Sequence, residues 1–284
     1  MSVPARTHLI DCSELAAGLT APEVVIVDCR FELGATDAGR AAYLEAHIPG
    51  ARYAHLDRDL SGPPHTDHGR HPLPPPDRMA AVFGRFGISA RSRVVVYDDS
   101  GGMIAARLWW MLRYLGHYEV VVLDGGWQAW VNRGGAVVSG DECAQPGHFT
   151  GTPRRECLVT VDEIPSVNCL VDARAPARYR GEHEPIDAAA GHIPGARNHC
   201  WQDNLAADGR FADPATLVRK LEASLGIVPD AATVHYCGSG VSACHNVFAQ
   251  VLAGLPEPRL YCGSWSEWCS DSGRARAIGR EFAQ

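Results

Sequence analysis

The chain repeats itself once, and this duplication constrains the fold more than any other feature. Four short blocks occur twice in the same order, at a shift of roughly 140 residues. They are "VDCR" (27–30) and "VDAR" (171–174), "HIPGAR" (47–52 and 192–197), "VVVYDDSGG" (94–102) and "TVHYCGSGV" (233–241), and "LDGGWQAW" (123–130) and "YCGSWSEW" (261–268). A period this long indicates two whole domains rather than a solenoid.

Turn-forming residues place the boundary between the two copies. Residues 141–156 lack apolar periodicity and are rich in turn formers, so we expect a linker there. The sequence thus predicts an N-terminal domain at 1–140 and a C-terminal domain at 157–284. A second loop, at 61–76, lies inside the first repeat, and its six prolines forbid regular structure.

Each copy alternates short apolar runs with helical patterns. The runs at 24–28, 93–98, 120–123, 169–173 and 233–237 are typical of buried strands. Apolar residues recur at helical spacing within 105–116 and 241–252. This alternation predicts an α/β fold in which each domain is a mostly parallel sheet covered by helices on both faces.

Composition excludes several classes of function. The 284-residue chain has a net charge of −7, which gives no basic footprint for nucleic acid. No apolar run reaches the roughly 20 residues of a membrane helix. The N-terminus lacks the apolar core of a secretory signal, and ten cysteines without such a signal suggest reduced thiols. We therefore expect a cytoplasmic protein.

A cysteine at the mouth of a glycine-rich turn is the strongest candidate for chemistry. Cys237 follows an apolar run and precedes Gly238 and Gly240, at the carboxyl end of a predicted strand, where ligands of such sheets bind. Glycines let several backbone N–H groups point inward, and these groups with the positive end of the following helix stabilise a thiolate or a persulfide. In the first copy Asp98 takes the place of the cysteine, so we expect one reactive site per chain.

Other sites with similar features fit less well. A cysteine phosphatase loop needs an arginine six positions after the cysteine, where Ala243 stands here. No Gly-Lys-Ser/Thr follows the glycines, which argues against a nucleotide-binding P-loop. His65, His68 and His71 recur every third residue, but their polar, proline-rich loop is a poor metal cage, and we expect no metal.

The tandem organisation, the duplicated "HIPGA", "CGSGVSA" and "GSWSEW" resemble the two-domain rhodanese-like sulfurtransferases. The loop "CGSGVS" is similar to that of the 3-mercaptopyruvate sulfurtransferases. The resemblance implies two tandem rhodanese-like domains, of which the second is catalytic, and no cofactor. It also implies that Cys237 takes sulfur from 3-mercaptopyruvate as a persulfide. An acceptor such as thioredoxin, a small thiol or cyanide then removes the sulfur.

The same resemblance carries over a proton-transfer group. It implies that Ser239 acts with His71 and Asp57 to deliver a proton to the enolate of pyruvate or to polarise the substrate carbonyl. His65 and His68 are alternatives to His71, and Asp59 is an alternative to Asp57.

For donor binding the resemblance implies Arg178, together with the loop residues Gly238, Gly240, Val241 and Ser242. A second arginine of the family follows a Glu-Pro pair, but Ile186 follows that pair here. This departure leaves thiosulfate as the alternative donor and Arg180 as a substitute cation. A third possibility is a non-catalytic sulfur-carrier or binding module, because rhodanese-like domains that lack the cysteine can act in that way.

Overall fold

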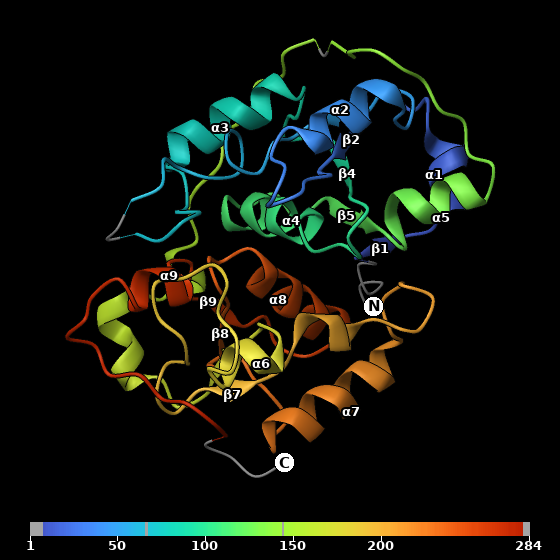
Figure 1. The fold of residues 1–284 in the computed structure, drawn as a ribbon. Helices are drawn as coiled ribbons and strands as arrows, with labels where there is room; N and C mark the ends of the chain where they lie inside the picture. The colour runs from blue at the N-terminus through green and yellow to red at the C-terminus, as the bar shows by residue number, and fades with distance from the viewer. Residues whose placement is uncertain (1–7, 66–67, 144, 281–284) are drawn as a thin grey trace, which may run out of the picture. The chain divides into compact units, whose positions relative to one another are not determined.

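The computed structural model describes residues 8–65, 68–143 and 145–280 and divides the chain into two compact units (Figure 1). The first unit contains the residues up to Asp59 and the segment Pro76–Pro153. The second unit contains Leu60–Pro75 and the chain from Arg154 onward. The proline-rich loop, which lies within the first repeat in sequence, therefore belongs to the second unit.

The first unit contains a parallel sheet of five strands in the order β1-β5-β4-β2-β3. The strands are β1 (Leu9–Ile10), β2 (Val24–Asp28), β3 (Arg52–Tyr53), β4 (Arg93–Tyr97) and β5 (Val120–Leu123). The helices that flank them are α1 (Cys12–Gly18), α2 (Ala38–Glu45), α3 (Pro76–Arg85), α4 (Ala105–Tyr114) and α5 (Gly126–Asn132). Every residue of α4 is buried, including Arg107 and Arg113.

The second unit contains a parallel sheet of four strands in the order β7-β6-β8-β9. The strands are β6 (Leu170–Asp172), β7 (Arg197–Asn198), β8 (Val234–Tyr236) and β9 (Arg259–Leu260). The helices are α6 (Pro176–Tyr179), α7 (Pro214–Leu225), α8 (Ser242–Leu252) and α9 (Ser264–Trp268), with 3-10 turns at Arg155–Cys157, Val161–Ser166 and Trp201–Asn204. The predicted α/β class with parallel sheets is confirmed, and each of the five apolar runs forms a strand.

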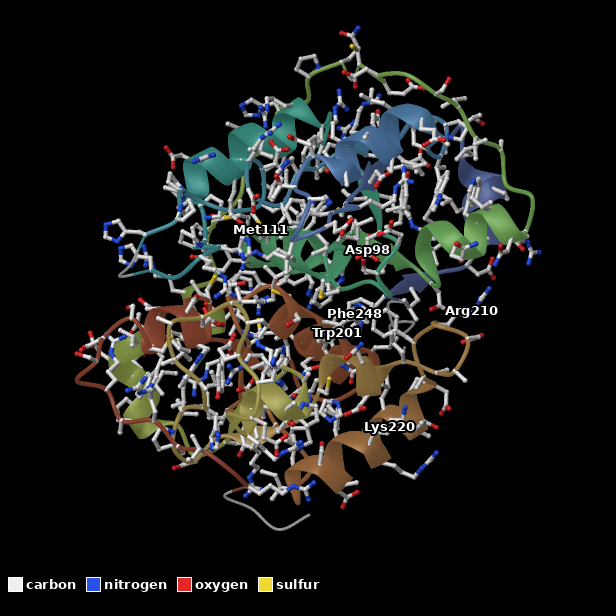
Figure 2. All side chains as sticks on the ribbon, in the orientation of Figure 1. Asp98, Met111, Trp201, Arg210, Lys220 and Phe248 are labelled. Carbon is white, nitrogen blue, oxygen red and sulfur yellow. The ribbon has the colours of Figure 1, made fainter. Side chains whose placement is uncertain are left out.

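Helix α8 carries the candidate loop at its N-terminus and is held rigidly. Its residues Ala243–Gln250 are all buried, among them Phe248, which Figure 2 labels. The buried polar side chains are paired, since Asn246 Oδ1 accepts a hydrogen bond from Asn204 at 2.8 Å and Gln250 Oε1 lies 3.0 Å from His235 Nε2. Paired polar groups in a packed core fix one orientation of the helix.

The repeated "VDCR" and "VDAR" blocks have the same structural role in both units. Arg30 and Arg174 are buried and pair with Asp28 and Asp172 at 2.7 and 2.6 Å. Each guanidinium also donates to a backbone carbonyl just before the "HIPGA" block, at 2.7 Å in both copies. These arginines therefore connect a strand end to the neighbouring turn in both units.

Within the described ranges, no helix has the length and apolar character needed to cross a membrane.

Candidate active site

Cys237 begins a tight loop between β8 and α8, and its sulfur faces the loop interior. The Gly240 N–H donates to Cys237 Sγ at 3.1 Å, and the cysteine is buried. Gly240 has a φ of +79°, and a Cβ at this position would lie 2.2 Å from the carbonyl oxygen of Cys262. Only glycine meets both conditions, so the predicted role of this glycine has a steric basis. Val241 follows as the N-cap of α8, and Ser242 begins the helix.

The first residues of α9 hold this loop through three hydrogen bonds. Ser264 Oγ accepts the Cys237 N–H at 3.1 Å, and the Trp265 and Ser266 N–H groups donate to the carbonyls of Cys237 and Gly238, both at 2.9 Å. Ser264 is buried and has a φ of +58°, which is unusual for a residue with a side chain. Sequence reasoning missed this residue. The counterpart of Ser264 in the first repeat is Gly126, whose φ is +55°. The glycine at this position of the first repeat was the sequence signal for a left-handed residue.

The first repeat shows what this strand–loop–helix frame does when no thiol is present. The Asp98 carboxylate, at the end of β4, accepts hydrogen bonds from the N–H groups of four residues (Figure 2). They are Ser100, Gly102 and Ile104 at 2.8 Å and Ala105 at 2.9 Å. Burial raises the pKa of Asp98, and these four hydrogen bonds oppose that shift. The strand–loop–helix frame therefore directs several backbone N–H groups toward an anionic side chain.

Ser239 and His71 form a close pair beside the loop. His71 Nδ1 lies 2.6 Å from Ser239 Oγ, and both side chains are buried. His71 belongs to Leu60–Pro75 and so to the same unit as the loop. The neighbouring His68 is exposed instead, with its Nδ1 3.8 Å from Glu267. A proton can pass between a serine hydroxyl and an imidazole nitrogen that are hydrogen-bonded to each other.

Asp57, the third predicted member of this group, lies in the first unit. Its backbone N–H donates to His55 Nδ1 at 3.1 Å. The alternative Asp59 pairs with Arg85 at 2.6 Å. The catalytic role of Asp57 stays a prediction.

Two arginines lie over Gly238, one predicted and one missed. A Cβ on Gly238 would lie 3.5 Å from both terminal nitrogens of Arg178 and 3.0 Å from Nη2 of Arg70. Arg178 also binds Glu184 at 2.8 and 3.1 Å and Asp187 at 3.0 Å. Arg70 precedes His71 in the chain. Its position over Gly238 could not be predicted from the sequence, because the proline-rich loop shows no periodicity.

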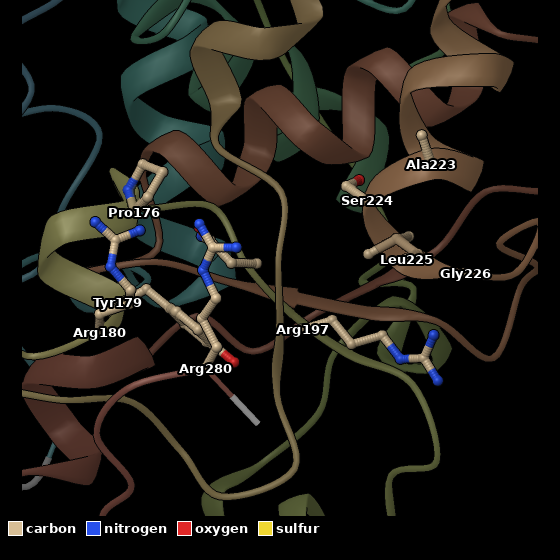
Figure 3. Close-up of a pocket in the computed structure, with 10 residues that line it drawn as sticks. Pro176, Tyr179, Arg180, Arg197, Ala223, Ser224, Leu225, Gly226 and Arg280 are labelled. Atoms are coloured by element: carbon tan, nitrogen blue, oxygen red, sulfur yellow. The ribbon is translucent and has the colours of Figure 1, made fainter. Parts of the chain in front are cut away.

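Arg180 lies at a different pocket. Its guanidinium binds Glu182 at 2.6 and 2.7 Å. With Arg197, Arg280 and other residues it lines a pocket of about 350 Å³ beside the end of α7 (Figure 3). Among the described residues, neither Cys237 nor Arg178 lines this pocket. No group of three or more His, Cys, Asp or Glu residues in the described chain is arranged to hold a metal ion.

Comparison with known proteins gives a consistent result. The rhodanese-like domain matches this chain twice, at residues 11–133 and 159–271. A protein named "Probable 3-mercaptopyruvate sulfurtransferase" from Pseudomonas aeruginosa is 47% identical over 280 residues, covering 96% of this chain and 98% of its own. The thiosulfate sulfurtransferase of Bos taurus is 34% identical over 264 residues, covering 89% and 88%. The solved 3-mercaptopyruvate sulfurtransferase from Leishmania major superposes with a TM-score of 0.83 at 34% identity, covering 94% of this chain and 75% of that one.

With two matched domains and full-length relatives, the chain belongs to the rhodanese-like family. Within that family it is a sulfurtransferase, as the sequence predicted.

Proposed function

We propose that the second unit transfers sulfane sulfur from 3-mercaptopyruvate to a thiol acceptor through a persulfide on Cys237. The observation that carries this proposal is the Gly240 N–H directed at Cys237 Sγ at 3.1 Å, in a loop whose counterpart binds a carboxylate with four N–H groups. A loop of this kind stabilises a thiolate, which is the nucleophilic form of cysteine.

In the first step, the Cys237 thiolate attacks the sulfur of the donor. The new S–S bond forms as the C–S bond of 3-mercaptopyruvate breaks, and its electron pair passes to the enolate of pyruvate. The enolate takes a proton to become pyruvate, and the hydrogen-bonded Ser239–His71 pair supplies it. Asp57, which belongs to the first unit, stays the predicted third member of this proton-transfer group.

The persulfide fits the dimensions of the loop. The outer sulfur of a Cys237 persulfide is two bonds from Cβ, as are the carboxylate oxygens of Asp98 in the first repeat. Of the N–H groups that hold Asp98, three correspond to those of Ser239, Val241 and Ala243 in the second repeat, while the fourth corresponds to the Cys244 N–H, which donates to the Val241 carbonyl at 3.0 Å. We infer that the first three of these groups and the first turn of α8 bind the charged outer sulfur.

In the second step, an acceptor thiolate or cyanide attacks the outer sulfur and releases Cys237 as thiolate. Thioredoxin, a small thiol and cyanide all suit this step chemically. None of the ten cysteines, all at described positions, forms a disulfide, and thiols persist in a reducing compartment, so we propose a cytoplasmic location. No cofactor takes part in either step.

The test combines mass spectrometry with kinetics. After incubation with 3-mercaptopyruvate, the peptide that contains Cys237 should gain the mass of one sulfur atom. Cys237→Ser should lose this gain and all turnover, while Cys143→Ser, which changes an exposed cysteine, should keep both. Modification at another cysteine, or a fully active Cys237→Ser, would remove the basis of the proposal. A kcat/KM far higher for thiosulfate would replace the donor and keep the nucleophile.

A further inference from the structure

The pocket beside the end of α7 lies within the second unit, and arginines dominate its wall. Its volume of about 350 Å³ is within the range of small-molecule sites in proteins. Among the ten residues that line it are Arg180, Arg197 and Arg280, which come from the C-cap of α6, from β7 and from the C-terminal segment (Figure 3). Of the described residues, none that lines this pocket is acidic. The wall therefore carries three positive charges.

The backbone brings these arginines to the pocket from three separate segments. The Gly279 N–H donates to the Arg180 carbonyl at 2.9 Å, so Arg280 is attached next to the end of α6. A Cβ on Gly226, the C-cap of α7, would lie 3.2 Å from Nη1 of Arg197. At that place the guanidinium offsets the partial negative charge of the helix end. The fold, rather than proximity in sequence, thus concentrates positive charge here.

One carboxylate outside the lining residues acts on two of these guanidiniums. Glu182 accepts hydrogen bonds from Arg180 at 2.6 and 2.7 Å. Its pKa is lowered, first by these hydrogen bonds and to a smaller extent by the charge of Arg280. The Glu182 side chain is 55% exposed, so water competes for this ion pair. Since each guanidinium has five N–H donors, the ion pair leaves donors for a second anion.

The wall on the α7 side is held in place by a chain of hydrogen bonds. Ser224, which lines the pocket, has its Oγ 2.6 Å from His199 Nδ1, and His199 Nε2 lies 2.9 Å from Asn204 Oδ1. The Asn204 amide nitrogen donates to Asn246 of α8 at 2.8 Å, so its oxygen accepts from Nε2 and Nδ1 accepts the serine hydroxyl. Burial lowers the pKa of His199, which keeps the imidazole neutral as this arrangement requires. The pocket is therefore largely formed before a ligand binds.

We propose that this pocket is a second binding site of the protein, for a small polyvalent oxyanion such as a phosphate or a polycarboxylate. Its oxygens accept charge-assisted hydrogen bonds from Arg180, Arg197 and Arg280, because the planar fork of a guanidinium matches both groups. An anion at this place also reduces the mutual repulsion of the three cations. The site is separate from the loop that carries Cys237, and the inference does not rest on the proposed function.

Calorimetry with two probes, inorganic pyrophosphate and citrate, tests the site. Loss of one charge-assisted hydrogen bond from a partly exposed guanidinium weakens binding by about tenfold, so Arg280→Ala and Arg180→Ala should each raise Kd by that factor. Arg219→Ala removes an exposed arginine of α7 that is not among the lining residues, and it should keep the wild-type Kd. Binding of pyrophosphate alone would assign a phosphate ligand, and binding of citrate alone a polycarboxylate.

A second readout uses the wild type, so it does not depend on the folding of a variant. Phenylglyoxal, an uncharged reagent, modifies accessible arginines. The bound probe should slow modification of Arg280 about tenfold at saturation and leave Arg219 unchanged, as followed by mass spectrometry of their peptides. If neither probe binds at millimolar concentration, or if the bound probe leaves Arg280 unprotected, the pocket is not an anion site.

Discussion

Replacing Gly240 by alanine should damage the active-site loop in a way that can be separated from ordinary backbone strain. Gly240 and Gly195 lie in the same unit and have the same φ of +79°. A Cβ on Gly195 would meet nothing within 4 Å, whereas a Cβ on Gly240 would lie 2.2 Å from the Cys262 carbonyl oxygen. Gly195→Ala is therefore a matched control.

The magnitude follows from these contacts. A left-handed alanine costs about 1–2 kcal/mol, so Gly195→Ala should lower the free energy of unfolding by that amount. In Gly240→Ala the Cys262 carbonyl must also retreat by about 1 Å to reach a normal contact. That movement weakens the hydrogen bond from the Cys237 N–H to Ser264 Oγ and the one from the Trp265 N–H to the Cys237 carbonyl, which contribute about 1 kcal/mol each. We expect a total loss of about 3–4 kcal/mol.

Gly240→Ala should also lower the activity of the molecules that remain folded. Moving residue 240 displaces its N–H from Cys237 Sγ, and a hydrogen bond to a charged group contributes about 1.5–3 kcal/mol. That energy corresponds to a fall of about ten- to a hundredfold in kcat/KM. The assays are denaturant unfolding and steady-state kinetics at a temperature where both variants are folded. If folded Gly240→Ala keeps the kcat/KM of Gly195→Ala, the loop does not act through this N–H group.

Three further predictions concern neighbouring positions. Gly238→Ala should fold normally but raise the donor KM, because its Cβ displaces only the flexible ends of Arg70 and Arg178; an unchanged KM would show that the two guanidiniums do not bind the donor. His71→Ala should lower kcat by about a hundred- to ten-thousandfold with little change in melting temperature, and a normal kcat would exclude it from proton transfer. Burial lowers the pKa of His235 to about 4, whereas an unfolded histidine titrates near 6.5. Below about pH 6.5 the unfolded chain therefore binds a proton that the folded chain does not, so the free energy of unfolding should fall by up to about 3 kcal/mol toward pH 4. His235→Gln should remove this part of the pH dependence in acid unfolding curves, and an unaltered curve would contradict the assignment.

Local patterns in the sequence predicted the elements that surround the site. The apolar run before Cys237 forms β8, the helical pattern after it forms α8, and the glycines between them form the tight loop. These features follow from short-range periodicity and backbone freedom, which one sequence displays directly.

Long-range partners could not be read in the same way. Arg70 and Asp187 come from loops without periodicity, and the fold alone decides that they meet. Ser264 is an intermediate case, since its left-handed backbone was visible only through Gly126 in the first repeat. Comparing the two copies at each glycine would have found it.

Because Leu60–Pro75 belongs to the second unit, the two units are not two consecutive stretches of the chain. A segment that lies in sequence between two parts of the first unit contributes to the second. A fragment that starts at Arg154 would carry the thiol yet lack Arg70 and His71, which lie against its loop. The segment Leu60–Pro75 thus brings His71 to the loop of the second unit, although it lies in sequence between two parts of the first unit, whose own loop carries Asp98 in place of a cysteine.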